Sequence, residues 1–433
     1  MRKVDFIVSA DAILTANSQQ PFIEKGAVAV QGSKIVGVET QGKILQQYES
    51  KKIFSLGDSL LTPGLINTHA HLPMSLLRGI ANDLSLDEWL TKHIFPKERQ
   101  NCSKEFVRLG TELALSELLL SGVTTVCDMY FFEDDIAEVC EEMGMRSVLG
   151  QSLFSGEAPD QASFEEGFHR AERFISRWKG HELVSPALAP HAPYSVDPDQ
   201  FRRCAELAKD SSVLLMSHIL ETKTEDSHFQ KRYGMSVTEM LEDSGCFEVP
   251  FLMAHFVWPN DSDLKRVTKN VAIAHCPQSN LKLADGFCPV QRLHDCELTV
   301  GLGTDGPASN NDFDFFAEIQ TAALIQKAIT ENPESLKANK VFEMATLDGA
   351  KALALQDKVG SLQVGKCADI IAISRDGLHH WPHHDVYAEF TYATKASDVT
   401  HVWVNGELLV ENKKLTRVDQ KDLRTRVKNF SIR

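Results

Sequence analysis

The middle of the chain carries the pattern that most constrains its fold, because short apolar runs alternate there with amphipathic stretches. The amphipathic stretches include 105–120, 199–209 and 237–244, which suit helices. This alternation is typical of parallel strands joined by helices. Seven or eight such units over residues 61–361 predict an α/β fold, a closed (β/α)8 TIM barrel. The strand-type runs are 122–128, 147–149, 183–189, 213–218, 251–254, 271–274 and 298–303.

An open, doubly wound sheet is the competing interpretation of the same alternation. Such sheets that bind dinucleotides carry a G-x-G-x-x-G turn after an early strand. No early strand of this chain is followed by that turn. The barrel is therefore the favoured interpretation.

Both ends of the chain read as short β segments separated by turns. Near the start these are 5–14, 26–30 and 34–39, and near the end 368–373 and 399–404. Asn405-Gly406 is a strong hairpin turn and predicts a returning strand at 407–410. We expect residues 1–60 and 362–433 to pair into one small β-sandwich domain beside the barrel at 61–361.

Charge and cysteine content exclude several classes of protein. The net charge of −15 argues against a general basic face, so no nucleic-acid partner is expected. The nine cysteines are odd in number, scattered and without a C-x-x-C pair, which is typical of reduced thiols. The chain shows neither a signal-peptide pattern nor a run of about 18 apolar residues, so we expect no membrane partner and a cytoplasmic location.

An apolar strand-type run, 65–71, ends in His69-Ala70-His71. Residues two apart in a strand point to the same side, so both imidazoles can reach one metal ion. Three later strand-type runs lead to His218, His255 and Asp305. All strand carboxyl ends meet at one face of a parallel barrel. Histidines and an aspartate gathered there are a plausible zinc set that leaves a position open for water.

Longer stretches carry a family resemblance over nearly the whole chain. The resemblance rests on the sequence around His69 and His71 together with Glu98, His191 and His218-Ile219-Leu220-Glu221. With these motifs the sequence resembles the amidohydrolase superfamily, and within it the 5'-methylthioadenosine/S-adenosylhomocysteine deaminases. The other matching stretches are Leu76-Leu77-Arg78-Gly79, Glu88-Trp89-Leu90, Ser279-Asn280-Leu281-Lys282-Leu283, Gly303-Thr304-Asp305-Gly306 and 360–369.

The resemblance implies a metal site made of His69, His71, His218 and Asp305. Relatives that hold two metals use a lysine at the end of the fourth strand, where this chain has Pro190-His191. One Zn²⁺ per subunit is therefore expected, although Fe²⁺ or Mn²⁺ would suit the same ligands.

The resemblance also implies the catalytic roles. Zinc lowers the pKa of a bound water toward ~7. Asp305 would take a proton from the water, Glu221 would protonate the purine ring and help ammonia leave, and His255 would hydrogen bond the attacking oxygen. The reaction would be hydrolytic deamination of an adenine nucleoside, an aminohydrolase reaction on a C–N bond of a cyclic amidine.

Substrate contacts are implied for Glu98, Trp89, His191 and Glu221, with Glu98 on the ribose hydroxyls and His191 on a purine ring nitrogen. Relatives that accept S-adenosylhomocysteine use arginines after the third strand, and Gln151 stands where one of them would align. A substrate carboxylate would lack a cation there. The expected order is 5'-methylthioadenosine, then adenosine, then S-adenosylhomocysteine.

Other readings stay open at this point. The scaffold could act on another N-heterocycle, such as guanine, a pterin or a chlorotriazine, or could be a non-catalytic relative. A homo-oligomer, dimer or tetramer, is expected from the resemblance. The tract His379-His380-Trp381-Pro382-His383-His384-Asp385 is a tempting second metal motif, but we interpret it as a surface loop or subunit contact.

Overall fold

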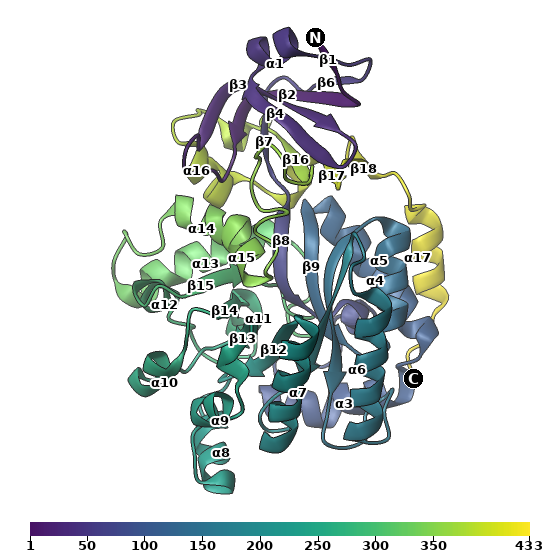
Figure 1. Ribbon diagram of the computed structural model, residues 1–433, viewed down its shortest axis with the longest axis vertical. Helices are drawn as coiled ribbons and strands as arrows, with labels where there is room; N and C mark the ends of the chain where they lie inside the picture. Colours follow the sequence, from purple (N-terminus) through teal and green to yellow (C-terminus); the bar gives the residue numbers. More distant parts are fainter.

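The computed structural model describes residues 1–433, and its centre is a closed barrel of eight parallel strands (Figure 1). The predicted barrel is confirmed. The strand order around it is β10-β11-β12-β13-β14-β15-β8-β9, so chain neighbours are also neighbours in space. The strands are β8 (Leu65–Ala70), β9 (Val123–Tyr130), β10 (Arg146–Leu153), β11 (Val184–Pro190), β12 (Leu214–Ile219), β13 (Phe251–His255), β14 (Val271–His275) and β15 (Thr299–Leu302).

Side chains alternate along each strand between two apolar cores. Along β11, Ala187 and Ala189 belong to the small core inside the barrel, whereas Leu188 belongs to the large core under the helices. Side chains two apart share a face of a strand, so one strand can supply both cores. Small alanines inside leave room for Met129 and Met216 from other strands.

Helices surround the barrel (Figure 1) and bury one face each. In α6 (Phe164–Trp178) the buried Phe164, Phe168, Ala171 and Ile175 recur every three or four residues, and the Ser163 hydroxyl caps the first turn. The other helices of the barrel are α4 (Lys104–Leu120), α5 (Glu133–Met143), α7 (Pro198–Ser211), α8 (Glu225–Tyr233), α9 (Val237–Asp243), α10 (Asp261–Arg266), α11 (Pro277–Lys282), α12 (Val290–Asp295), α13 (Phe315–Thr330), α14 (Ala338–Ala345) and α15 (Leu347–Ala352).

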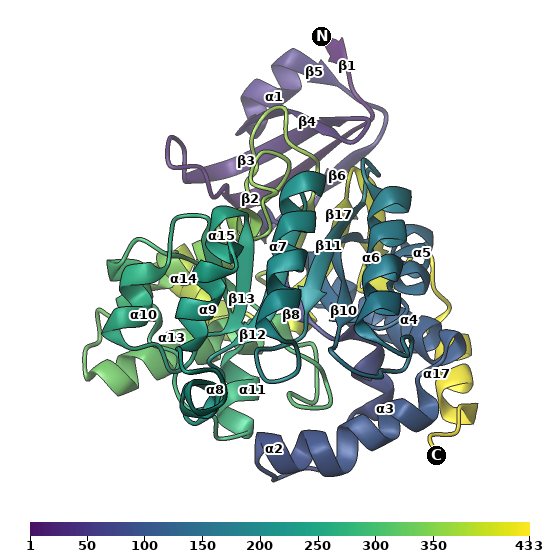
Figure 2. The same ribbon diagram turned by 60° about the horizontal axis from the view of Figure 1, so that its bottom comes forward.

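The segment between β8 and α4 covers the carboxyl end of the barrel. It contains the 3-10 turn η1 (Leu72–Leu77), α2 (Leu86–Glu88), the π-helical η2 (Trp89–Ile94) and α3 (Phe95–Asn101). Figure 2 shows α2 and α3 at the bottom of the molecule, near α8 and α11, while the strands of the small domain lie at the top. The mouth of the barrel and the small domain are therefore at different ends of the molecule.

The two chain ends form the small domain together, as expected. Its main sheet has nine strands in the order β19-β18-β17-β16-β7-β2-β3-β4, with β6 paired to β2. Along β2, Phe6 and Val8 pack into one apolar cluster and Ile7 into another, so both sheet faces are covered. The elements are β2 (Phe6–Leu14), β3 (Phe22–Gln31), β4 (Lys34–Thr40), β6 (Ile53–Ser55), β7 (Ser59–Pro63), β16 (Ile370–Ser374), β17 (Val399–Val404), β18 (Glu407–Glu411), β19 (Lys414–Leu415), the separate pair β1 (Arg2–Lys3) and β5 (Tyr48–Glu49), and α1 (Gln41–Gln47).

A buried ion pair joins the two domains. The Arg146 guanidinium, at the start of β10, donates from Nε and Nη2 to the two oxygens of Asp369, both at 3.0 Å. Asp369 directly precedes β16 and its Oδ1 also accepts from the Asn405 backbone N–H. This bidentate geometry fixes the junction, because both charges are withdrawn from water and paired.

The remaining elements are short turns and a C-terminal helix. Between β16 and β17 lie η4 (Leu378–His380), α16 (Val386–Ala388), η5 (Glu389–Ala393) and η6 (Ala396–Asp398); the others are the 3-10 turn η3 (Cys246–Glu248) in the barrel and α17 (Gln420–Asn429). None of the helices in the structure is both long enough and apolar enough to cross a membrane.

Candidate active site

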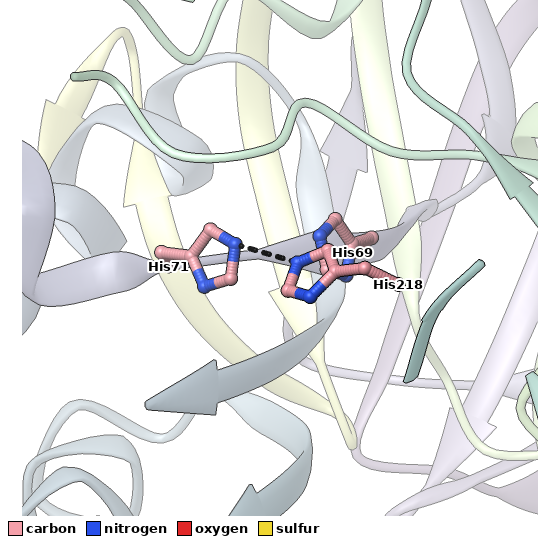
Figure 3. A group of neighbouring side chains, drawn as sticks. All are labelled: His69, His71 and His218. Carbon is pink, nitrogen blue, oxygen red and sulfur yellow. Dashed lines mark hydrogen bonds between the residues drawn. The ribbon is translucent and has the colours of Figure 1, made fainter. Parts of the chain in front are cut away.

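The four predicted ligand side chains converge at the mouth of the barrel. His69 and His71 come from the end of β8, His218 from β12, and Asp305 from the loop after β15 (Figure 3 shows the three histidines). His71 Nε2 lies 3.3 Å from His218 Nε2 and 3.1 Å from Asp305 Oδ1. His69 Nε2 lies 3.5 Å from Asp305 Oδ1. All four residues are buried.

The hydrogen bonds of these histidines orient their rings for binding a metal ion. The Nδ1 atoms of His71 and His218 each lie 2.8 Å from a backbone carbonyl oxygen, that of Met129 and that of His191. If both Nδ1 atoms donate to these carbonyls, the neutral rings present lone pairs on Nε2, which face one another. Tetrahedral zinc with Zn–N bonds of about 2.0–2.1 Å separates its ligand atoms by about 3.3 Å, close to the spacing here.

His69 supports the same conclusion from burial. Its Nε2 is buried and has no hydrogen-bond partner within the protein. A buried polar atom without a partner costs free energy, and a cation among these ligand atoms would supply one. The ligand atoms of His69, His71 and His218 all lie within 4.8 Å of one another.

Asp305 is held by two serines that the sequence interpretation missed. Its Oδ2 accepts hydrogen bonds from Ser279 Oγ at 2.7 Å and Ser309 Oγ at 2.9 Å, which turns Oδ1 toward His69 and His71. Burial alone would raise the pKa of Asp305, but the imidazoles of His69 and His71 beside it hold that pKa well below its usual range. Asp305 is therefore an ionised carboxylate, as a metal ligand must be.

His255 lies beside this cluster at the end of β13. Asn280 donates from Nδ2 to its Nδ1 at 3.0 Å, so the ring hydrogen is on Nε2, which lies 3.5 Å from Glu221 Oε1. Burial, with His69 and His71 nearby, lowers the pKa of His255 to about 3, although Asp305 acts in the opposite direction. The ring is thus neutral and offers one hydrogen-bond donor. Asn280 lies in a matching stretch of the sequence but was given no role.

Glu221 is buried three residues after His218. Its carboxyl pKa is raised well above its usual range, first by burial and then by the carboxylates of Asp285, Asp305 and Glu225. Glu225 also accepts from the backbone N–H groups of Leu220 and Glu221 and so fixes the turn after β12. The environment of Glu221 therefore favours the protonated carboxylic acid, which suits a residue that donates a proton.

The residues predicted for substrate binding line the same pocket as His71, His218 and Asp305 of the metal-ligand set. Trp89 comes from η2 and Glu98 from α3, in the segment that covers the barrel end, and His191 directly follows β11. The structure therefore brings all the predicted side chains to one place. The other lining residues include Met74, Leu86, Leu90, Phe95, Tyr130, Phe131, Phe154 and Tyr194.

Two of these contacts set the chemistry of the substrate side. Tyr130 donates its hydroxyl hydrogen to Glu98 Oε1 at 2.6 Å, and burial raises the pKa of Glu98 to about 7 in spite of that bond. The His191 ring stacks on Phe154, with centroids 4.4 Å apart, and its Nδ1 lies 2.8 Å from Ser195 Oγ. No sequence motif marks Tyr130, the last residue of β9, or Ser195, which lies five residues after β11.

Gln151, the residue aligned with a missing arginine, is turned away from the pocket. It is buried and donates from Nε2 to Asp160 Oδ2 at 2.9 Å. Arg170 also donates from Nη2 to the backbone carbonyl oxygen of Asp160 at 2.6 Å. A second cavity shares Glu98 and Phe154 with the pocket and is also lined by another cation, Arg99, together with Glu157. Sequence interpretation did not single out Arg99, although it directly follows Glu98.

Comparison with known proteins agrees with this geometry. Residues 60–409 match the model of the amidohydrolase family. A 5-methylthioadenosine/S-adenosylhomocysteine deaminase of Thermodesulfovibrio yellowstonii is 38% identical over 96% of this chain and 96% of its own. One of Syntrophobacter fumaroxidans is 36% identical over 98% of this chain and 97% of its own.

Solved structures show the same fold throughout. An adenosine deaminase from Xanthomonas campestris with bound zinc has a TM-score of 0.97 and 34% identity, covering 99% of this chain and 98% of its own. An atrazine chlorohydrolase from Arthrobacter aurescens, complexed with zinc, has a TM-score of 0.91 and 25% identity, covering 98% and 99%. The chain belongs to the amidohydrolase family, and it is a hydrolase whose barrel mouth holds a metal-binding cluster.

Proposed function

We propose that this protein is a zinc-dependent deaminase of adenine nucleosides, with 5'-methylthioadenosine as the favoured substrate. The observation that carries the proposal is one pocket lined by His71, His218, Asp305, Glu221 and Glu98, with His69 in the same ligand cluster. Relatives named as 5-methylthioadenosine/S-adenosylhomocysteine deaminases, aligned over nearly the whole chain, support it.

His69, His71, His218 and Asp305 are the residues that would hold the zinc ion. When bound, zinc lowers the pKa of a water molecule so that a nucleophile is available near neutral pH. Fe²⁺ and Mn²⁺ suit the same nitrogen and oxygen ligands, so metal analysis of the purified protein decides among them. The complete ligand set argues against a non-catalytic scaffold.

The chain's own side chains handle the protons of the reaction. Asp305, ionised and beside the cluster, takes a proton from the attacking water. Glu221, which carries a proton, gives it to a ring nitrogen of the purine, and a proton then reaches the amino group so that ammonia leaves. His255 donates from Nε2 to the attacking oxygen as charge develops there, with Asn280 fixing its tautomer. Water and the amino-purine give the oxo-purine and ammonia.

The pocket also orients the nucleoside. Glu98 accepts hydrogen bonds from the ribose hydroxyls through an oxygen that Tyr130 leaves accessible. Trp89 and Phe95 supply apolar walls, and Tyr130 closes the pocket beside Glu98. When the Ser195 hydroxyl donates to Nδ1 of His191, the ring carries its hydrogen on Nε2 and can donate it to a purine ring nitrogen.

The substituent on the ribose decides the order among substrates. Gln151 is committed to Asp160, so it offers nothing to an amino-acid carboxylate. This supports 5'-methylthioadenosine over S-adenosylhomocysteine. Arg99 and Glu157 both line the adjacent cavity, so Arg99 supplies a cation there that would reduce the difference.

Location and assembly are part of the proposal. All nine cysteines are free, and most are buried, which supports a reducing, cytoplasmic environment. We also expect a homo-oligomer, dimer or tetramer, which sedimentation analysis would test.

The experiment is an ultraviolet deamination screen of the zinc-loaded protein, with ammonia measured in parallel. The substrates are 5'-methylthioadenosine, adenosine, S-adenosylhomocysteine, guanine, cytosine, a pterin and atrazine. The proposal expects the highest kcat/KM on 5'-methylthioadenosine. Turnover confined to guanine, the pterin or atrazine would replace it with the alternative on the same scaffold. A clear advantage for S-adenosylhomocysteine would overturn the substrate order alone.

A further inference from the structure

A second cluster of metal-ligand type lies in the loop between β16 and β17. His379 and His380 belong to η4, and Asp398 ends η6, eighteen residues beyond His380. His379 Nε2 lies 2.9 Å and His380 Nε2 lies 3.2 Å from the same carboxylate oxygen, Oδ2 of Asp398. The three potential ligand atoms all lie within 4.8 Å of one another. Two imidazoles therefore converge on one carboxylate.

The surroundings of His380 are those of a metal ligand. Its other ring nitrogen, Nδ1, lies 2.9 Å from Glu389 Oε1. Arg375 donates to both oxygens of Glu389, at 2.8 and 2.7 Å, and holds that carboxylate in place. Histidines that bind metals commonly donate their second ring N–H to a carboxylate, which fixes the tautomer and strengthens the other nitrogen as a ligand.

This arrangement leaves a place for a cation. A neutral imidazole has one N–H, and if Glu389 accepts it, Nε2 of His380 faces Asp398 Oδ2 with a lone pair. Two acceptors then meet at 3.2 Å, and either a proton or a metal ion between them removes the repulsion. The His380 side chain is fully buried, so water does not screen this contact.

We propose that His379, His380 and Asp398 form a second site for a divalent transition metal of the Zn²⁺ type, separate from the cluster in the barrel. Two imidazole nitrogens and a carboxylate oxygen supply three ligands, and the exposed side at His379 leaves the fourth position to water. The inference does not rest on the proposed function, because none of these residues lines the active-site pocket.

The position in the fold defines what such an ion would do. Figure 1 shows α16, which follows this tract, beside the strands of the small domain, whereas α3 and α8 mark the opposite end of the molecule. An ion here would fasten η4 to η6 and so close the loop between β16 and β17. Its role is to stabilise the small domain, since binding to the folded state alone raises stability by mass action.

The test measures metal content of the full-length chain. Untagged protein is required, because a polyhistidine tag would bind the same ions. After equilibrium dialysis against micromolar free Zn²⁺ and removal of unbound ion, wild type should retain two ions per chain. His379→Ala should retain one, because this exposed side chain supplies a ligand. His384→Ala is the matched control, since His384 is an exposed histidine of the same tract outside the cluster, and it should retain two.

One ion per chain in wild type, or two in His379→Ala, would overturn the proposal. Crystals grown with Zn²⁺ give an independent measurement that needs no variant. An anomalous peak between the His379 and His380 rings and Asp398 is expected, and a peak in the barrel without one in this loop would also overturn it. Because the barrel ion is counted separately in these crystals, failure of this site is distinguishable from failure of the active site.

Discussion

The two histidine clusters of this protein contain the same ligand types but differ in what supports and surrounds them. In the barrel, the Nδ1 atoms of His71 and His218 contact backbone carbonyl oxygens. In the loop, Nδ1 of His380 contacts the Glu389 carboxylate. The barrel cluster opens onto a pocket with Glu98 and Glu221. The loop cluster has no counterpart of Glu98 or Glu221 in an apolar pocket beside it. Ligands alone therefore define a metal site, and the neighbouring groups define an active site.

The largest expected effect comes from removing a ligand in the barrel. His218→Ala should lower kcat/KM by at least about 1000-fold, because several kcal/mol of charge stabilisation is lost and each 1.36 kcal/mol is tenfold. Metal analysis should show loss of the barrel ion. His379→Ala, the matched change in the loop, should leave kcat/KM unchanged. If the two variants lose activity equally, the distinction between the clusters is wrong.

Glu221 separates metal binding from chemistry. Glu221→Gln keeps the shape of the side chain but cannot donate and take back a proton, so kcat should fall by about 100- to 10,000-fold. Zinc content should stay at the wild-type level, because Glu221 is not among the ligand atoms. A kcat within a fewfold of wild type would show that another group moves the proton.

Support of Asp305 is expected to matter less than the ligand itself. The double change Ser279→Ala with Ser309→Ala removes both hydrogen bonds to Asp305 Oδ2. Zinc affinity or activity should fall by about 10- to 100-fold, as for other groups that orient metal ligands. Competition with a chelator measures the affinity. Ser262→Ala, at an exposed serine of α10, serves as control.

Glu98 gives a pH dependence of intermediate size. Its pKa is raised to about 7, so below that value it becomes a neutral acid and can no longer accept both ribose hydrogens. We expect kcat/KM to rise with pH and level off above about pH 7 if the free-enzyme value governs it, with KM carrying most of the change. In Glu98→Gln this rise should disappear, and a profile identical to wild type would remove Glu98 from ribose binding.

The smallest effect is expected at Arg99. Arg99→Ala should lower kcat/KM for S-adenosylhomocysteine less than about tenfold, since a partly exposed ion pair is worth about 1 kcal/mol. The value for 5'-methylthioadenosine, which lacks the amino-acid carboxylate, should not change. Equal losses on both substrates would mean that Arg99 acts on the fold of α3 instead.

Strand ends could be predicted from the sequence because they depend on local pattern. His69, His218 and Asp305 each follow an apolar run, and parallel strands deliver their ends to one face. The contacts that tune the site could not be predicted in this way. Tyr130 reaches Glu98 and Asn280 reaches His255 across 32 and 25 residues, and no periodicity encodes such pairs.

The second histidine cluster, in the loop between β16 and β17, also depends on contacts that the sequence does not reveal. His379 and His380 were visible as part of a tract, but Asp398 and Glu389 are separated from it in sequence and complete it only in the fold. The sequence predicts a surface loop or subunit contact for the tract, and most of it is exposed, but His380 is buried. Burial of one histidine in a polar tract depends on packing against η5 and η6, which composition does not reveal.

The central claim is that the barrel cluster and its pocket deaminate an adenine nucleoside. The most direct measurement follows 5'-methylthioadenosine and ammonia together, with zinc-loaded wild type and the metal-free protein side by side. The account predicts one ammonia released per nucleoside converted to its inosine analogue, and turnover that depends on the metal. A zinc-loaded protein that releases no ammonia from 5'-methylthioadenosine, adenosine or S-adenosylhomocysteine would contradict it.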